Sequence, residues 1–358
     1  NLNDNTPVIT SNGAGASAAV NVAENSVAVT TVTATDADAL GALTYSIIAG
    51  ADAARFTIDA SSGLLSFVAA PNFEAPSDVG VNNVYNVTVR VSDGTLIDTQ
   101  AIAVTVTPVN DINPVITSNG GAASVAISVA ENSSAVTTVT ATDADLPVQT
   151  LTYSISGGAD AARFTINAST GVLSFIAAPN FEAPTDAGGN NVYDVTVQAS
   201  DGTLTDTQAI AVTVTNLNDN TPVITSNGAG ASAAVNVAEN SVAVTTVTAT
   251  DADALGALTY SISGGADAAR FTIDASSGLL SFVAAPNFEA PSDVGANNVY
   301  NVTVRVSDGT LTDTQAIAVT VSDANEFPVG AISDADAAAN SVAENAGVGT
   351  LVGVTALA

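Results

Sequence analysis

Five residue types are absent from the 358 residues of this sequence: cysteine, histidine, lysine, methionine and tryptophan. The absence of cysteine excludes disulfide bonds and thiolate metal sites. Without histidine, cysteine and lysine, the groups that usually activate a nucleophile are missing, and we expect no hydrolase of the triad type. No apolar run is long enough to cross a membrane as a helix, so we expect no direct membrane insertion of this segment.

Positive charge is also scarce. Thirty-five acidic side chains face five basic ones, all arginine, for a formal net charge of −30. Nucleic acids and anionic lipid surfaces repel such a chain, so neither is an expected partner. Strong charge can indicate disorder, but only 11% of residues are charged and 47% are hydrophobic. We therefore expect a folded protein whose acidic groups are neutralised by something that it binds.

Internal repetition is the dominant feature of the sequence. The string VAEN recurs at Glu24, Glu131, Glu239 and Glu344. Residues 1–106 and 216–321 differ at only four positions, which a recent duplication of a two-repeat unit explains. We predict three repeats and the truncated start of a fourth, at 1–108, 109–215, 216–322 and 323–358. The chain begins without a signal-peptide pattern, and we expect it to be an internal part of a longer protein.

Alternating apolar residues predict short β-strands within each repeat. In residues 84–94, the apolar face holds Tyr85, Val87, Val89 and Val91. No stretch shows a helical period. About seven such strands in roughly 100 residues predict an all-β fold: tandem seven-stranded antiparallel β-sandwiches of the immunoglobulin type, in a linear array.

The acidic residues recur at fixed places in turns and at strand ends. Each full repeat carries, in order, the glutamate of VAEN, the two aspartates of TDAD, the glutamate of PNFE and the aspartate of SDG. Pro-containing linkers with the pattern NDN or NDI join the repeats. Aspartate favours turns, so each string alone could be a solvated turn; together they indicate a binding function. Oxygen-only ligands suit a hard cation such as calcium and fit zinc or copper poorly.

These strings, with GADAARFTIDASSGLLSF, resemble those of cadherin repeats, in the bacterial cadherin-like form found in giant adhesins. The resemblance covers the three full repeats and the start of the fourth. It implies a calcium cluster at each junction. The upstream repeat would supply its VAEN and PNFE glutamates, the linker its side chains and a backbone carbonyl, and the downstream repeat its TDAD and SDG aspartates.

The resemblance assigns the ligands residue by residue. At the first junction they are Glu24, Glu74, Asn110, Asp111, Asp143, Asp145 and Asp201. At the second junction they are Glu131, Glu182, Asn218, Asp219, Asp251, Asp253 and Asp308. At the third junction they are Glu239, Glu289, Asp323, Asn325 and Glu326. In the N-terminal linker and the first repeat they are Asn3, Asp4, Asp36, Asp38 and Asp93.

Three departures from the family pattern reduce the number of ligands. The first linker position, usually aspartate in the family, is Asn or Pro in three of four linkers. Ile112 stands where the other two NDN linkers have Asn5 and Asn220, and the family's DRE becomes Asn72-Phe73-Glu74. We therefore expect two ions at each junction rather than three.

Electrostatics indicates what the ions would do. Two carboxylates ~5 Å apart, at an effective dielectric constant of ~20, repel each other by roughly 3 kcal/mol. A divalent cation bound among the carboxylates attracts all of them, so it replaces the repulsion and holds them together. We expect calcium, bound with a dissociation constant of roughly 10⁻⁴–10⁻³ M, to stiffen each linker and align the sandwiches.

The sequence thus predicts a calcium-rigidified extender or stalk of a large adhesin, secreted or on the surface of a bacterial cell. Two alternatives stay open: a structural subunit of an extracellular fibre, sheath or biofilm matrix, and a module that binds copies of itself. The expected partners are calcium ions and neighbouring repeats or copies of the same protein. We expect no enzyme, because identical carboxylates recur in every repeat. Asp98, Asp206 and Asp313 are interpreted as turn residues rather than ligands.

Overall fold

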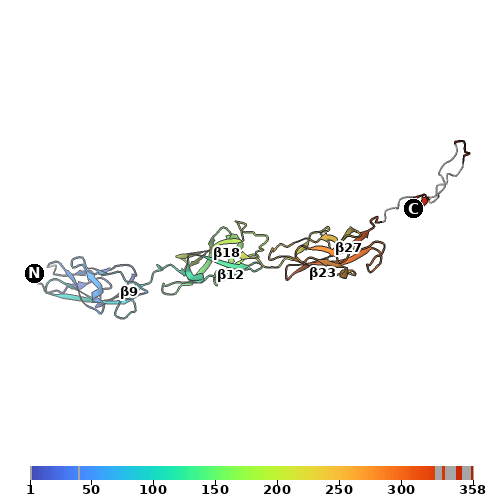
Figure 1. Ribbon diagram of the computed structural model, residues 1–358. Coiled ribbons are helices and arrows are strands. Elements are labelled where there is room, and N and C mark those ends of the chain that lie inside the picture. The colour runs from blue at the N-terminus through green and yellow to red at the C-terminus, as the bar shows by residue number, and fades with distance from the viewer. Residues whose placement is uncertain (1, 39–40, 327–332, 335–343, 349–355, 358) are drawn as a thin grey trace. The chain divides into compact units, whose positions relative to one another are not determined.

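The computed structural model describes residues 2–38, 41–326, 333–334, 344–348 and 356–357. The chain divides into two compact units, 1–216 and 217–358. The first unit holds two β-sandwiches and the second holds one (Figure 1). Most of the predicted fourth repeat, 323–358, lies outside the described residues.

The first sandwich consists of a four-stranded sheet in the order β2-β9-β8-β5 and a three-stranded sheet in the order β3-β7-β6, with a short β1-β4 ladder. The two sheets contain the seven strands that the sequence predicts, and the β1-β4 ladder adds two short strands. The bounds are β1 Val8–Ile9, β2 Ser17–Ala23, β3 Ala28–Thr31, β4 Ala34–Thr35, β5 Thr44–Ala49, η1 Ala53–Arg55, β6 Phe56–Ile58, β7 Leu64–Phe67, β8 Val84–Ser92 and β9 Ile97–Thr107.

The other two sandwiches repeat this plan. The second contains β10 Val115–Ile116, η2 Ser118–Gly121, β11 Ser124–Ala130, β12 Ala135–Thr138, β13 Ala141–Thr142, β14 Thr152–Gly157, η3 Ala161–Arg163, β15 Phe164–Ile166, β16 Val172–Phe175, β17 Val192–Ser200 and β18 Thr205–Thr215. The third contains β19 Val223–Ile224, β20 Ser232–Ala238, β21 Ala243–Thr246, β22 Ala249–Thr250, β23 Thr259–Gly264, η4 Ala268–Arg270, β24 Phe271–Ile273, β25 Leu279–Phe282, β26 Val299–Ser307 and β27 Thr312–Ser322. A two-residue ladder joins β28 Ser333–Asp334 to β29 Ala356–Leu357.

Each sandwich has a hydrophobic core of its own. The predicted alternation of β8 is confirmed, because its apolar face is buried while Asn86 is exposed. The ring of Phe56 stacks on Phe67 at 4.6 Å, and Tyr85 meets Phe67 edge to face at 5.1 Å. Full burial of one such side chain stabilises the fold by roughly 1.5–3 kcal/mol, so each sandwich can hold itself together without disulfides.

One strand pair in each sandwich departs from the antiparallel prediction. β2 runs parallel to β9, with Ser17 opposite Ala101 and Ala23 opposite Thr107. The chain reaches this position by leaving the short β1-β4 ladder and crossing to the other sheet through residues 10–16, where Asn12 has a φ of +52°. The other ladders of the first sandwich are antiparallel.

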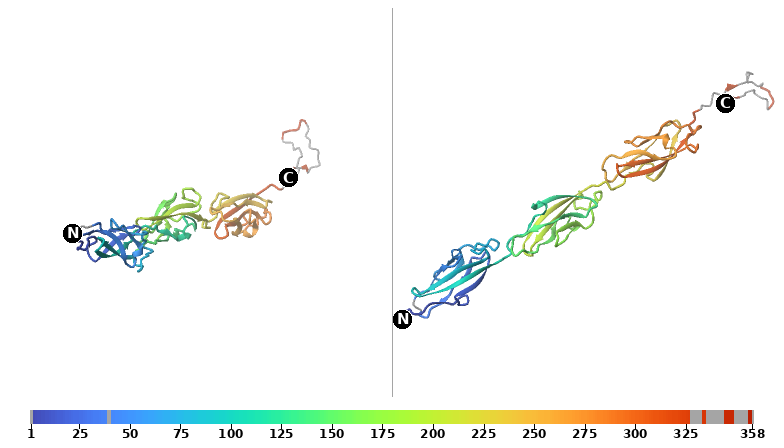
Figure 2. Two further views of the ribbon diagram at one scale, coloured as in Figure 1. Left: turned by 90° about the vertical axis from the view of Figure 1, so that its left-hand side faces the viewer. Right: turned by 90° about the horizontal axis from the view of Figure 1, so that it is seen from below.

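This parallel pairing determines where the acidic motifs lie. Because β2 and β9 finish together, the backbone N–H of Glu24 donates to the carbonyl of Thr107 at 3.0 Å. β8 runs against β9, so Asp93, which follows β8, lies at the opposite end. The strands run roughly along the long axis of each sandwich (Figure 2). Glutamate motifs therefore lie at one end of a sandwich and the SDG aspartate at the other.

Candidate metal centre

We call the segment between the first and second sandwiches, residues 108–115, the first linker. It begins at a cluster of three acids, Glu24, Glu74 and Asp111, which we call the glutamate cluster. Each offers one carboxylate oxygen, and these oxygens all lie within 4.8 Å of one another. Glu24 is buried. Its Oε2 accepts a hydrogen bond from the N–H of Phe73 at 2.8 Å, and its Oε1 accepts one from the N–H of Val109 at 2.7 Å. Glu24 thus ties the PNFE loop to the linker.

Glu74 is less well satisfied than Glu24. Its Oε1 accepts a hydrogen bond from the N–H of Leu146 at 3.3 Å, while its Oε2 is buried without a hydrogen-bond partner. Burial, and then the charge of Glu24, raise the pKa of Glu74. A buried carboxylate with an unpaired oxygen is unfavourable without a positive partner.

The same linker ends at a second acidic group, Asp143, Asp145 and Asp201, which we call the aspartate cluster. One oxygen from each lies within 4.8 Å of the others. The TDAD turn places the first two, because the N–H of Asp145 donates to Asp143 Oδ1 at 2.9 Å. The turn after β17 places Asp201, whose Oδ1 accepts from the N–H groups of Thr203 and Leu204 at 2.6 and 2.7 Å.

Several oxygens around this cluster are buried and lack any hydrogen-bond donor. They are Asp143 Oδ2, Asp145 Oδ1, Asp201 Oδ2 and Asn110 Oδ1. Asn110 uses its Nδ2 to donate to Gln149 Oε1 at 3.0 Å and to Thr203 Oγ1 at 3.1 Å, which leaves its oxygen unused. Burial raises the pKa of Asp145, and the negative charge of Asp143 raises this pKa further.

This donor set fits calcium. Unpaired carboxylate and amide oxygens, with no nitrogen or sulfur ligand among them, are what a hard divalent cation requires. At an effective dielectric constant of ~20, two charged oxygens about 5 Å apart repel by roughly 3 kcal/mol. The structure therefore brings together all seven residues assigned to the first junction in two neighbouring groups along one linker.

The N-terminal linker holds its aspartates differently. Asn5 donates its side-chain amide to Asp38 Oδ1 at 2.6 Å and its backbone N–H to Asp38 Oδ2 at 2.6 Å. These hydrogen bonds lower the pKa of Asp38, and the bond from the side-chain amide has the largest effect. Of the predicted ligands here, Asp36 accepts from the N–H of Asp38 at 2.9 Å and Asn3 donates to Thr95 Oγ1 at 2.5 Å. Among the described residues, only the aspartate cluster brings three aspartate oxygens within 4.8 Å.

The residues assigned to the second junction belong to different units, and each half is described by itself. In the first unit, Glu131 is buried and its Oε2 accepts from the N–H of Phe181 at 2.7 Å. In the second unit, Asp253 accepts from the N–H of Asp219 at 3.0 Å and from the amide of Asn220 at 2.6 Å. The remaining residues keep their positions from the first linker: Glu182 follows the PNF turn, Asp251 precedes Asp253, Asn218 donates to Thr310 Oγ1, and Asp308 lies in the turn after β26.

The start of the third predicted junction repeats the glutamate cluster. Oxygens of Glu239, Glu289 and Asp323 lie within 4.8 Å of one another. Glu239 accepts from the N–H of Ala324 at 2.9 Å. Glu326 accepts from the amide of Asn240, and Asn325 is exposed. Partial desolvation, then the charges of Glu239 and Glu289, raise the pKa of Glu326.

The interpretation of Asp98, Asp206 and Asp313 as turn residues was wrong. Each lies within the last long strand of its sandwich, and its Oδ2 accepts a hydrogen bond from the N–H of an isoleucine in the first strand, at 2.8 to 2.9 Å. The strand ladder leaves that N–H without a backbone partner, and the aspartate supplies one. These aspartates are structural.

Sequence reasoning also missed a buried aspartate, Asp52. Its Oδ1 accepts from the N–H of Val79 at 2.7 Å, and its Oδ2 accepts from the N–H of Asn86 at 2.8 Å. Asp160 and Asp267 make the same pairs of bonds in the other sandwiches. The recurring string GAD was the available signal. Both bonds of each aspartate stay within its own sandwich, so these aspartates anchor a loop.

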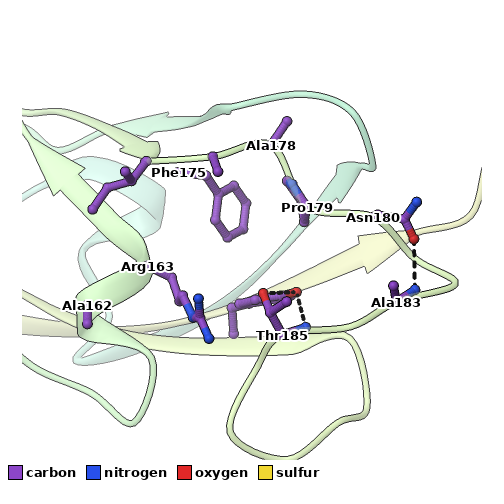
Figure 3. A pocket seen from close by; sticks show the side chains of 11 residues that line it. Ala162, Arg163, Phe175, Ala178, Pro179, Asn180, Ala183 and Thr185 are labelled. Atoms are coloured by element: carbon purple, nitrogen blue, oxygen red, sulfur yellow. Dashed lines mark hydrogen bonds between the residues drawn. The ribbon is translucent and has the colours of Figure 1, made fainter.

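A pocket on the second sandwich is a concave alternative to the acidic groups (Figure 3). It has a volume of about 260 Å³ and is lined by Arg163, Phe175, Pro179, Thr185 and Tyr193, among others. The other two sandwiches repeat it at about 130 Å³. The hydroxyl of Tyr193 accepts from the N–H of Thr185 at 3.1 Å. The pocket lies over the edge of the core. Pro179 and Asn180 of the PNFE string line it, but no acidic side chain does.

Tandem β-sandwiches with carboxylate clusters at their ends define a class of repeat protein. The cadherin domain model matches residues 18–110, 125–215 and 233–322. The chain belongs to the cadherin domain family. Cadherin repeats are modules of adhesion proteins on the cell surface, and they are adhesion modules rather than enzymes. No helix within the described residues is both long and apolar enough to span a membrane.

The matched relatives are animal cadherins. The chain is 32% identical over 306 residues to mouse "Cadherin EGF LAG seven-pass G-type receptor 2", covering 82% of this chain and 10% of the relative. It is 30% identical over 310 residues to human "Protocadherin Fat 1", covering 82% of this chain and 6% of the relative. The chain thus spans a tenth or less of the length of these relatives.

Solved structures show the same fold. Mouse Cadherin-23 EC22-24 matches with a TM-score of 0.66 at 24% identity, over 90% of this chain and 100% of that one. The Protocadherin GammaB4 extracellular domain matches with a TM-score of 0.59 at 23% identity, over 91% of this chain and 51% of that one. The predicted all-β sandwich class is confirmed.

Proposed function

We propose that this chain is a calcium-rigidified extender, or stalk, of a large secreted or cell-surface adhesin. One observation carries the proposal: five side-chain oxygens along the first linker are buried without a hydrogen-bond donor. They belong to Glu74, Asn110, Asp143, Asp145 and Asp201. Buried polar groups without partners are rare in folded proteins, and this many acidic ones in one place require positive charge.

The linker residues are already tied to both acidic groups through their backbone. Val109 donates its N–H to Glu24 at 2.7 Å, and Ile112 donates its N–H to Asp145 at 3.2 Å. Calcium, when bound, would supply the positive charge that these carboxylates lack. Glu24, Glu74 and Asp111 would hold it on one side, and Asn110 with the aspartate cluster on the other. Residues 109–112 form a short segment that is hydrogen-bonded at both ends. Neutralising the glutamate cluster and the aspartate cluster would therefore remove the freedom of this segment to reorient.

The ligand sets assigned to every junction, two ions at each, and the repeat boundaries after residues 108, 215 and 322 belong to this proposal. The third junction supports it through the glutamate cluster of Glu239, Glu289 and Asp323. Affinities should lie at roughly 10⁻⁴–10⁻³ M, as in other extracellular modules. Such sites would be filled outside the cell and empty inside it.

The sequence supports a stalk over a recognition module. Repeats 1–106 and 216–321 differ at four positions, and a surface that recognises a partner usually diverges between copies. A bacterial source stays a prediction, because the matched relatives are animal proteins. The second candidate, a subunit of an extracellular fibre, sheath or biofilm matrix, is favoured by the same near-identity, since identical units pack regularly.

Calorimetric titration of the whole chain with calcium tests the proposal. We expect heat of binding in the submillimolar range and a rise in melting temperature with calcium. The matched variant Asp143→Asn/Asp145→Asn/Asp201→Asn keeps the size of each side chain and removes three charges, so it should lose at least one binding step. Equal titrations of both proteins, or no calcium-dependent shift in melting temperature, would contradict the proposal.

A further inference from the structure

The outward face of each four-stranded sheet carries a single charged side chain. In the first sandwich, this face consists of the residues that alternate with the core residues of β2, β9, β8 and β5, and its one charge is Arg90. In the second sandwich the one charge is Asp194, and in the third it is Arg305. All these strands lie within the described residues. The charges therefore alternate in sign along the chain, although acidic residues outnumber basic ones by 35 to 5.

Uncharged side chains surround each of these charges on its own sheet. Arg90 lies opposite Thr99 of β9 and Ser46 of β5, and its Nε donates to Ser46 Oγ at 3.1 Å. Asp194 is exposed and lies opposite Ala211 of β18. Neither charge has an oppositely charged neighbour on its own sheet face, so each is open to an ion pair with another molecule.

The face of the second sandwich is hollowed beside its aspartate. A cavity of about 280 Å³ is lined there by Asp194, Gly158, Ala209 and Ala211, among others. A long side chain that enters from outside would reach the carboxylate of Asp194 while its methylene groups contact alanine. Arginine has this shape, with an apolar stem and a charged end that pairs with carboxylates.

The positions of the polar residues along their strands are complementary. β8 and β17 each have nine residues, of which Arg90 is the seventh in β8 and Asp194 is the third in β17. When two such strands face each other in opposite directions with their centres aligned, the seventh residue of one lies opposite the third of the other. The same alignment puts Asn86, the third in β8, opposite Gln198, the seventh in β17. Arginine with aspartate and asparagine with glutamine are both hydrogen-bonding pairs.

We propose that this sheet face binds a second copy of the chain: the first or third sandwich of one copy packs on the second sandwich of the other, and Arg90 or Arg305 pairs with Asp194. Sheets commonly pack face to face, about 10 Å apart. Two first sandwiches packed together would cover two arginines without an acidic partner, which is unfavourable. The alternating charge therefore selects which repeats meet. The inference goes beyond the proposed stalk and uses no residue of the acidic clusters.

The size of the face limits the strength of the contact. Four strands ~4.8 Å apart, with about nine residues at ~3.3 Å each, give a face of roughly 500 Å². Two faces together would bury about 1,000 Å², which is near the lower limit for a specific interface. One pair of faces therefore supports a weak and reversible contact, and its choice of partner depends on the ion pair.

Sedimentation equilibrium of the whole chain, at protein concentrations up to about 1 mM, tests this inference. Calcium and physiological salt are present to screen the net charge, and we expect reversible self-association of the wild type. Arg90→Asp/Arg305→Asp makes all three faces acidic and Asp194→Arg makes all three basic, so each variant alone should associate about tenfold more weakly. A mixture of the two variants again offers opposite charges, so it should associate like the wild type.

A matched control separates this surface from net charge. Arg55→Asp/Arg270→Asp makes the same change in charge at two exposed arginines outside the face, the last residues of η1 and η4, and it should associate like the wild type. A monomeric wild type, equal weakening by the control, or a mixture that stays monomeric overturns the inference. If Asp194→Arg does not fold, as judged by circular dichroism, Asp194→Asn decides, because unchanged association of that variant contradicts the inference.

Discussion

Carboxylates of one cluster differ in how many hydrogen-bond donors they receive, and this decides what each one does. Glu24 has a donor for each oxygen, from the backbone of Phe73 and of Val109. Glu74, its neighbour in the cluster, has one oxygen without any. Glu24 therefore stabilises the fold even without a cation. Glu74 is a buried charge without full compensation, and a bound cation would supply that compensation.

Glutamine substitution should separate these two roles. Glu24→Gln replaces one accepting oxygen by an NH₂ group that faces a backbone N–H, so it should lower the stability of the chelated protein by about 2 kcal/mol. Glu74→Gln removes an unpaired buried charge, so it should raise the melting temperature in chelator and reduce the gain on adding calcium. Scanning calorimetry with and without calcium checks both. Equal effects of the two substitutions in chelator would contradict this assignment.

A turn aspartate outside the metal centre predicts an acid-sensitive contribution to stability. Hydrogen bonds from the N–H of Ser62 and the hydroxyl of Ser61 lower the pKa of Asp59 well below its ordinary value of 3.8. A carboxyl group whose pKa is lower in the folded than in the unfolded state stabilises the fold at pH values above its ordinary pKa. This stabilisation is lost as the pH falls through the lowered pKa. The second repeat has the uncharged Asn167 in this place, with its oxygen accepting from Ser169 and Thr170.

The expected result is a pH-dependent difference between variants. Asp59→Asn should lower the melting temperature of its repeat at about pH 7, and the difference should be clearly smaller at about pH 2. The converse change, Asn167→Asp, should raise the melting temperature at about pH 7 only. Thermal unfolding followed by circular dichroism at both pH values measures this. A constant difference across the pH range would show that charge has no part in it.

At the scale of strands and turns, one glycine allows the turn between β6 and β7 to approach the segment after β3 closely. Gly63 lies in the turn before β7 with a φ of +73°, and a Cβ there would lie 2.1 Å from the carbonyl oxygen of Val32. The N–H of Val32 donates to the carbonyl of Gly63 at 2.8 Å. Gly94 also has a positive φ, +108°, but a Cβ there would meet nothing within 4 Å.

Alanine at these two glycines should therefore have unequal effects. Gly63→Ala forces the backbone apart and should destabilise the first sandwich by about 3 kcal/mol or more. Gly94→Ala adds only the strain of a left-handed residue, about 1 kcal/mol. Chemical denaturation of both variants measures the difference. Similar losses would mean that the close contact at Val32 yields without strain.

The strands and the positions of the acids could be predicted from the sequence, because period-two burial and repeated motifs are local signals. Tyr85 and Val87 were correctly placed in the core for this reason. The parallel pairing of β2 with β9 could not, since it depends on where the chain crosses between sheets. The strand position of Asp98 was missed because its partner, the N–H of Ile9, lies 89 residues away. The different bonding of Asp38 and Asp145 also needed coordinates.

At the scale of the whole molecule, the net charge of −30 makes the chain dependent on counterions. Acidic groups recur at the ends of each sandwich, so repulsion concentrates at the linkers rather than spreading over the surface. Monovalent salt screens charges more than about 8 Å apart at physiological strength but acts little on oxygens in contact. Sodium chloride should therefore not replace calcium in stiffening the linkers.

Small-angle X-ray scattering of the whole chain in calcium, and then in excess chelator, tests the central claim most directly. If a hard cation fixes the linkers, the maximum dimension and radius of gyration should fall on chelation as the sandwiches gain freedom to bend. Magnesium at the same concentration should restore little of the length, because it prefers a rigid octahedral site. Superimposable scattering curves in calcium and in chelator would contradict the account.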